Sequence, residues 1–143
     1  MEKPEAQPVV GLVLAALAAL LLIGVATFAG PCGEHGGQDV ASCQWASRAV
    51  LGIGAATAIL AVVRIFETDE GERRGLSLAC ALLGFLAATL PGPIIGLCVD
   101  PTMHCNAVMH PFVLVTGVSI GAVGAVDLTR RLWAIRKRPV DAE

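Results

Sequence analysis

Five side chains that can bind soft metals lie close together in the second half of the chain. They are Met103, His104, Cys105, Met109 and His110. Sulfur from cysteine and methionine suits Cu(I), and imidazole suits copper or zinc. One hypothesis for this chain is therefore soft-metal binding, with copper as the cofactor. A disulfide at Cys105 would count against it, because an oxidised cysteine offers no thiolate.

Four of the five cysteines form two pairs outside the apolar runs of the chain, Cys32 with Cys43 and Cys98 with Cys105. If these segments face an oxidising compartment, structural disulfides are the expected outcome. Four cysteines allow three connectivities, and the sequence does not choose among them. We favour Cys32–Cys43 and Cys98–Cys105, because each bond would close a short loop and stabilise the fold by up to about 3 kcal/mol.

A thiol–disulfide redox protein acting through Cys98 and Cys105 is a further hypothesis. Four-span thiol oxidases that pass electrons to quinone also carry two outward cysteine pairs. Their chemistry favours a Cys-x-x-Cys pair, and no two cysteines here have that spacing. The sequence contains no phosphate loop, nucleophile elbow or paired-carboxylate motif, so we expect a protein that is not an enzyme.

The cysteines and histidines must be positioned by four long apolar runs. Apolar residues make up 55% of the 143 residues and charged residues only 15%, whereas a soluble domain has about a quarter charged. Each run has about the 20 residues that a helix needs to cross roughly 30 Å of hydrocarbon. The predicted spans are residues 9–29, 46–66, 76–97 and 112–133, within a single membrane domain that covers residues 1–143.

The basic residues predict the orientation of these spans. An even number of spans places both termini on one side, together with the turn at residues 67–75. Nine of the ten Lys and Arg residues then share that side, and only Arg48 lies on the other. Positive charge favours the cytoplasmic side. We therefore expect a multi-pass protein of the cell membrane with cytoplasmic termini, and with outer loops at residues 30–45 and 91–111.

The chain divides into two similar helical hairpins, at about residues 9–66 and 76–133, and each outer loop carries one cysteine pair. Both hairpins start in the cytoplasm, which is the pattern of a parallel repeat about an axis normal to the membrane. The predicted fold class is an all-α membrane protein, a four-transmembrane-helix bundle built from two similar helical hairpins.

Polar and small residues inside the spans allow two interpretations each. Asp127 precedes Arg130 and Arg131 by three and four residues, a spacing that places them on one helix face. Pairing at the helix end is favoured over a proton relay.

The run Pro91-Gly92-Pro93 also has two interpretations: it ends or bends its helix, or it breaks a helix that lines a site. Small residues at Gly52-Ile53-Gly54-Ala55-Ala56 and at Gly117, Gly121 and Gly124 predict a tight bundle or a self-association face. Cys80 is expected to be a small buried hydrophobe.

The segment from Leu90 to Cys105 resembles an uncharacterised family of small four-span bacterial membrane proteins, known as a domain of unknown function. The signature is Gly-Leu-Cys followed by Met-x-Cys, matched here by Gly96-Leu97-Cys98 and Met103-His104-Cys105, with an earlier Pro31-Cys32 and Cys43. The first loop departs from this pattern at Ala41-Ser42-Cys43, which weakens the case for two equivalent metal sites. Members look like neighbours of ABC-type exporter genes, so the resemblance implies an accessory role and no activity.

Taken together, these patterns predict a non-enzymatic accessory or scaffold protein of the bacterial inner membrane. The expected partners are the lipid bilayer and another membrane protein, such as a transporter permease. Binding of nucleic acid is not expected, because aromatic residues make up only 4% of the chain and Tyr is absent. Soft-metal binding through the Cys98–His110 loop is the alternative, and thiol–disulfide exchange is the third hypothesis.

Overall fold

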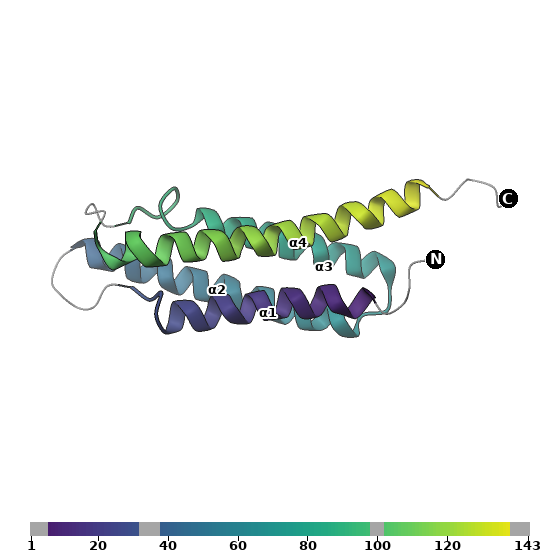
Figure 1. Cartoon of the computed structure of the whole chain (residues 1–143), viewed down its shortest axis with the longest axis horizontal. Helices are drawn as coiled ribbons and strands as arrows, with labels where there is room; N and C mark the ends of the chain where they lie inside the picture. Colours follow the sequence, from purple (N-terminus) through teal and green to yellow (C-terminus); the bar gives the residue numbers. More distant parts are fainter. Residues whose placement is uncertain (1–5, 32–37, 98–101, 138–143) are drawn as a thin grey trace.

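The computed structural model describes residues 6–31, 38–97 and 102–137, and most of them are helical (Figure 1). Over these ranges the only β contact is an isolated bridge between Pro91 and Ile95. An all-α protein is thereby confirmed. The helices are α1 (Ala6–Ala26), α2 (Gln38–Phe66), α3 (Glu70–Thr89), the short π-helix η1 (Cys105–Met109) and α4 (His110–Arg136).

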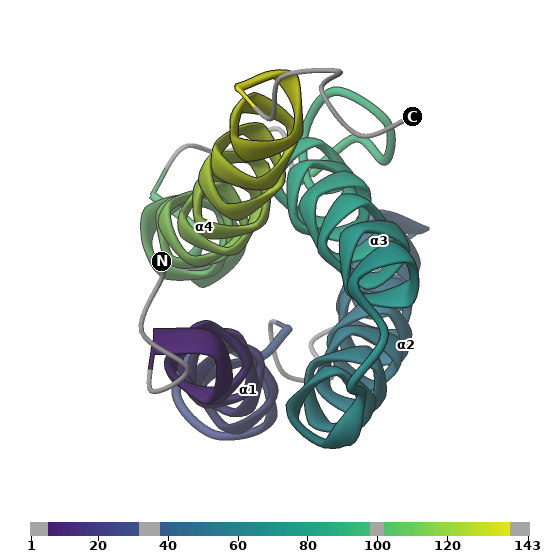
Figure 2. The same cartoon turned by 90° about the vertical axis from the view of Figure 1, so that its right-hand side faces the viewer.

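The four α-helices run antiparallel to their neighbours and form two hairpins (Figure 1). The closest contacts join α1 to α2 and α3 to α4, while α2 also contacts α3 and α1 also contacts α4. Viewed end-on, the helices follow one another around a ring (Figure 2). We call the end where α2 and α4 finish the arginine end, and the opposite end, where α2 and η1 begin, the cysteine end.

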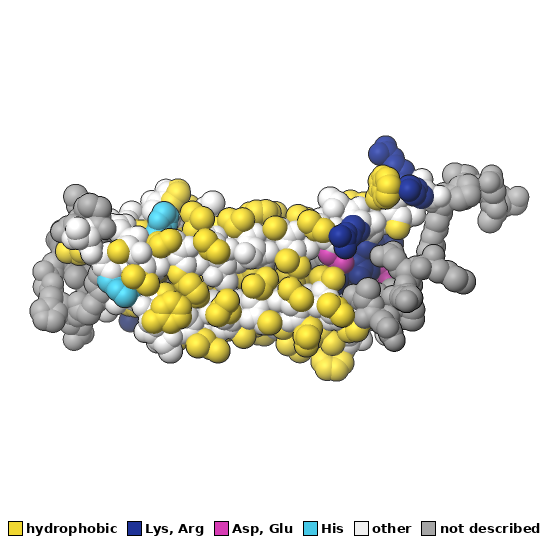
Figure 3. All heavy atoms as spheres, in the orientation of Figure 1, with side chains coloured by type: hydrophobic (Ala, Val, Ile, Leu, Met, Phe, Trp, Pro, Cys, Tyr) yellow, Lys and Arg dark blue, Asp and Glu magenta, His cyan; other side chains and the backbone are white. Residues whose placement is uncertain are grey.

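The face of the molecule seen in Figure 3 is apolar along most of its length. Large hydrophobic side chains such as Leu12, Ile23, Ile59 and Val115 are more than half exposed. Three helical segments are long and apolar enough to cross a membrane. In the most apolar 18-residue stretch of each, no more than 39% of the residues are buried. They correspond to three of the predicted spans and are Pro8–Ala26, Ser42–Phe66 and Cys105–Arg136.

Helix α3 differs from the predicted span at residues 76–97 at both ends. It begins at Glu70, because the Asp69 carboxylate caps it by accepting from the amides of Gly71 (2.6 Å) and Glu72 (3.2 Å). It ends at Thr89, so the rest of the apolar run is not helical. Its first five residues carry four charges, which leaves 15 uncharged residues from 75 to 89, or about 22 Å of helix. This helix is not among the three long apolar ones.

A tight turn follows α3 at Pro91-Gly92-Pro93. The Gly92 amide donates to the Ile95 carbonyl, and the Ile95 amide donates to the Leu90 carbonyl, both at 2.9 Å. Gly92 has a φ of +97°, a conformation that favours glycine because it has no Cβ. The simple interpretation of the proline pair, that the helix ends here, is confirmed.

Helices α3 and α4 approach each other closely through glycines. A Cβ added to Gly84 would lie 2.5 Å from the Gly121 amide nitrogen and 2.8 Å from the Gly117 carbonyl oxygen, and one added to Gly124 would lie 2.8 Å from the Ser77 carbonyl oxygen. Small residues allow such backbone contact between helices in lipid. The glycines of α4 are therefore used inside the chain, whereas a Cβ at Gly52 on α2 would meet no atom within 4 Å.

Replacing Gly84 with alanine should force α3 and α4 apart, because the new methyl group would meet backbone atoms. We expect Gly84→Ala to lower the free energy of unfolding by about 1–3 kcal/mol. The control Gly52→Ala places the same methyl group in open space, and should leave stability unchanged or raise it by up to about 1 kcal/mol through helix propensity. Thermal unfolding in detergent micelles measures both, and equal Tm values would contradict the packing described.

Candidate functional site

A buried guanidinium at the arginine end joins three helices. Arg64 lies in the last turn of α2 and is only 1% exposed. Its Nη2 donates to Asp127 Oδ2 on α4 at 2.6 Å, and its Nε donates to Ser77 Oγ on α3 at 3.0 Å. The two hairpins are thus connected through one side chain, since α2 belongs to the first hairpin and α3 and α4 to the second.

Asp127 accepts three hydrogen bonds at a single oxygen. Besides Arg64, the hydroxyl of Ser77 (2.7 Å) and Nε of Arg131 (2.9 Å) donate to Oδ2. Arg131 Nη1 in turn donates to Glu70 Oε2 at 2.6 Å. Two guanidinium charges therefore face two carboxylates, and a third guanidinium, that of Arg73, pairs with Glu70 from the same helix at 3.7 Å. We call Arg64, Glu70, Ser77, Asp127 and Arg131 the charge network.

The pairing of Asp127 with Arg131, predicted as helix-end pairing, is present, but its main partner was missed. Arg64 is 63 residues away in the sequence, so helical spacing gives no signal for it. The one available hint was that both Arg64 and Asp127 lie within apolar runs near the same predicted end. Arg130, the other expected partner, is exposed and has no ion pair with the described residues.

Two carboxyl groups interact where α2 is joined to α3, outside the long apolar helices: Glu67 lies in the connection and Glu72 in the first turn of α3. Hydrogen bonds from the Asp69 amide, from Glu72 and from the Thr68 amide lower the pKa of Glu67. The hydrogen bond and charge of Glu67 raise the pKa of Glu72. A lowered pKa favours folding as pH rises and a raised one opposes it, so the two effects on stability act in opposite directions across the acidic range.

At the cysteine end, two cysteines from different hairpins pack together. Cys43 of α2 and Cys105 of η1 are both fully buried in one small cluster, against which Leu97 packs. The pairs favoured from the sequence each lie within one loop, so this contact between the two hairpins was not predicted. No disulfide joins two of the described cysteines, which are Cys43, Cys80 and Cys105. Cys32 and Cys98 lie outside the described residues, so the two favoured pairings stay predictions.

The five predicted metal ligands are divided between the surface and the interior. Met103 is 43% exposed, whereas Cys105 and Met109 are fully buried. The Nε2 of His104 lies 2.7 Å from the Phe28 carbonyl oxygen, and because a carbonyl only accepts, Nε2 must carry the hydrogen. That nitrogen is therefore already hydrogen-bonded to the backbone that follows α1.

His110, the remaining predicted ligand, is partly buried at the start of α4, next to the turn at Gly92. Within the ranges that the structure describes, no three His, Cys, Asp or Glu side chains are grouped so that they could hold a metal ion. Copper binding stays a prediction from the sequence. Cys80, by contrast, is fully buried in the core, as expected for a small hydrophobe.

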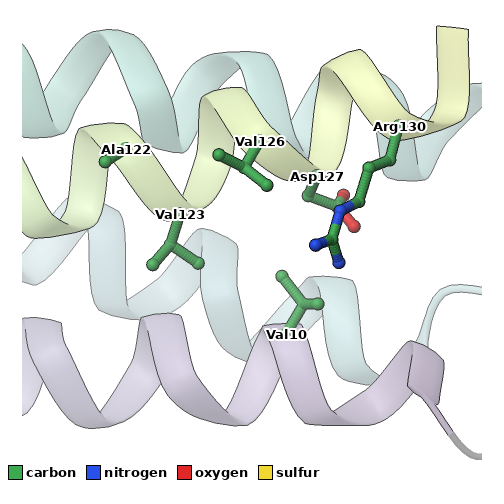
Figure 4. Close-up of a pocket in the computed structure, with 6 residues that line it drawn as sticks. All are labelled: Val10, Ala122, Val123, Val126, Asp127 and Arg130. Atoms are coloured by element: carbon green, nitrogen blue, oxygen red, sulfur yellow. The ribbon is translucent and has the colours of Figure 1, made fainter. Parts of the chain in front are cut away.

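An open cleft lies beside the charge network, between α1 and α4 (Figure 4). Asp127 and Arg130 line it together with apolar side chains of both helices. Sequence reasoning did not identify this feature, because α1 contributes only a valine without any distinctive motif.

The fold and these sites define a helical protein of membrane type, with polar groups gathered at its two ends. The chain matches the model of a family described as a domain of unknown function (DUF4418) over residues 13–129. This match spans 117 of the 143 residues (129 − 13 + 1), and the chain belongs to this family. The resemblance to an uncharacterised family, known as a domain of unknown function, is thereby confirmed. No curated protein and no solved structure matched the chain.

Replacing Asp127 with asparagine tests whether the charge network stabilises the fold. The variant leaves the guanidiniums of Arg64 and Arg131 without the carboxylate between them, and loss of one partner of a buried pair costs about 3 kcal/mol or more. We expect Ser77→Ala to cost less, about 1.5 kcal/mol, since it removes hydrogen bonds to Arg64 and Asp127 but leaves their ion pair in place. Chemical unfolding in detergent without added lipid measures both changes.

The matched control is Arg130→Gln, which removes a charge three residues away from Asp127 on the same helix. Arg130 is exposed and outside the network. The free energy of unfolding of Arg130→Gln should therefore stay within about 0.5 kcal/mol of that of the unmodified protein. If Asp127→Asn and Arg130→Gln had the same stability, the network would have no structural role.

Proposed function

We propose that this protein crosses the bacterial inner membrane four times and serves as a non-enzymatic accessory or scaffold component for another membrane protein, such as the permease of an ABC-type transporter. The observation that carries the proposal is an outward face of small residues on α2, a helix apolar enough to cross a membrane. Gly52, Ala55 and Ala56 on this face are exposed, and small residues at this spacing suit close contact with another helix in lipid.

The proposed fourth crossing is α3. The glycine contacts hold α3 directly against α4 along much of its length, so a bilayer that surrounds α4 also surrounds α3. Leu78, Leu82, Phe85 and Leu86 on α3 are exposed and would contact lipid. The turn at residues 90–97 would complete the crossing at the membrane surface.

The proposed orientation places the arginine end in the cytoplasm. Of the eight described basic residues, only Arg48 lies towards the cysteine end, where it stacks on Trp45 at 5.7 Å from the ring centroid. This asymmetry supports cytoplasmic termini by the positive-inside rule. The seven at the arginine end are Arg64, Arg73, Arg74, Arg130, Arg131, Arg136 and Lys137.

Reporter fusions test the number and direction of the crossings. Alkaline phosphatase is active only outside the cytoplasm, so we expect activity when it is inserted at residues 34–37 or fused after residue 101. We expect no activity when it is fused after Thr68 or after residue 143. Activity after Thr68, or the same result on both sides of α3, would contradict the four-crossing topology.

The scaffold role predicts a stable partner that depends on the small face of α2. Ala56→Leu should block close helix contact and release a membrane protein that co-purifies in stoichiometric amounts with the tagged, unmodified chain. Ala19→Leu makes the same change at an exposed position on α1 and should retain the partner. Equal recovery of the partner with both variants would count against the role of this face.

We also propose that disulfides close the cysteine end. Burial of Cys43 and Cys105 in one cluster supports an enclosed, structural role for these sulfurs more than exposed exchange chemistry. Peptide mapping by mass spectrometry, with and without reductant, should find four oxidised outer cysteines and identify which of the three connectivities forms. Four alkylated thiols in protein isolated without reductant would contradict the proposal.

A further inference from the structure

The cleft between α1 and α4 combines apolar walls with charge at one end. Its volume is about 270 Å³, below the roughly 300–1,000 Å³ of sites that enclose whole small molecules. It therefore suits part of a longer molecule. Its lining consists of Val10, Ala122, Val123, Val126, Asp127 and Arg130 (Figure 4).

The charges around the cleft leave one cation available. The Asp127 carboxylate is already met by Arg64 (2.6 Å) and Arg131 (2.9 Å). Arg130 is exposed, and no ion pair or hydrogen bond joins it to another described residue. The cleft thus presents a net positive charge at the arginine end, which is complementary to an anion.

A second unmet donor belongs to Arg64, which bonds to the cleft residue Asp127 but does not itself line the cleft. Nη1 of Arg64 is buried and makes no hydrogen bond with the described part of the chain. It belongs to the guanidinium whose Nη2 bonds to Asp127, one of the cleft residues. A buried donor without an acceptor is costly, so the Arg64 guanidinium is satisfied only in part by Asp127 and Ser77.

The order of these groups along α4 matches the shape of a lipid. Val126, Val123 and Ala122 precede Arg130 by four, seven and eight residues, so all four lie on one helix face. The cation is nearest the arginine end, and the apolar side chains continue from it towards the middle of the helix. A charged headgroup at Arg130 would therefore place an attached hydrocarbon chain along the valines.

We propose that this cleft binds an anionic phospholipid of the surrounding leaflet, with the phosphate at Arg130 and one acyl chain between Val10, Val123 and Val126. This site rests on the proposed membrane crossing, which places the arginine end at the cytoplasmic surface, where basic pockets between helices attract anionic headgroups. The lipid fills the cleft between the first and the last helix of the ring.

Retention of lipid by the full chain tests the proposal. The protein is reconstituted in vesicles of equal parts phosphatidylglycerol and phosphatidylcholine, recovered by flotation, released into detergent and examined by native mass spectrometry. We expect one phosphatidylglycerol to remain bound to the monomer, in preference to phosphatidylcholine. Arg130→Gln should weaken this binding about fivefold, the effect of one basic residue near a membrane surface.

Two further variants separate charge from shape. Arg130→Lys keeps the charge and should retain most of the binding, while Ala122→Phe keeps all charges but fills the cleft and should also release the lipid. Arg136→Gln is the matched control, since it removes an exposed cation of the same helix outside the cleft, and it should change retention less than twofold.

Several outcomes would overturn the lipid site. The first is an equal loss of bound phosphatidylglycerol in Arg130→Gln and Arg136→Gln, and the second is equal retention of phosphatidylglycerol and phosphatidylcholine by the unmodified protein. The third is displacement of the lipid by 10 mM inorganic phosphate alone, and the fourth is a dimer that Ala122→Phe converts to monomer. The first two remove the specific role of Arg130, the third indicates a phosphate site without a chain, and the fourth indicates a second copy in the cleft. Failure of the protein to float with vesicles would instead contradict the membrane crossing itself.

Discussion

The contact between Arg64 and Asp127 is the constraint on which the relation between the two hairpins depends. Each hairpin is held internally by contacts between helices that follow one another in the chain. The guanidinium of Arg64, by contrast, links the last turn of α2 to both helices of the second hairpin. Because a buried ion pair is favourable only when its geometry is complete, this end of the molecule admits few alternative arrangements.

The remaining contacts are shaped by two demands that differ along the molecule. In the middle, α3 and α4 approach backbone to backbone, and small side chains such as Gly84 and Gly117 allow this close packing. At the arginine end, the helices are joined by the long cationic side chains of Arg64 and Arg131 instead of by glycine contacts. The cleft lies where these two regions meet, so it has an apolar part and a cationic part.

The sequence predicted the helical class and three of the long helices, because an uninterrupted apolar run of sufficient length has few other solutions. It also predicted that Asp127 pairs with Arg131, which helix periodicity makes visible. It could not predict Arg64 as the main partner, nor the packing of Cys43 against Cys105, because both contacts join residues more than 60 positions apart. The early start of α3 was missed for a different reason, since charged residues conceal a helix whose first turn is fixed by the Asp69 cap.

Helix α3 has a shorter uncharged length than α4, which matters if both helices cross the bilayer as proposed. The 15 uncharged residues of α3 correspond to about 22 Å, against a typical hydrocarbon thickness of about 30 Å. If α3 is a crossing, the bilayer on that side of the molecule becomes thinner, while on the opposite side it keeps its full depth. Such one-sided hydrophobic mismatch costs free energy that a second protein with an equally short flank would relieve, so the length of one helix can select the neighbour beside it.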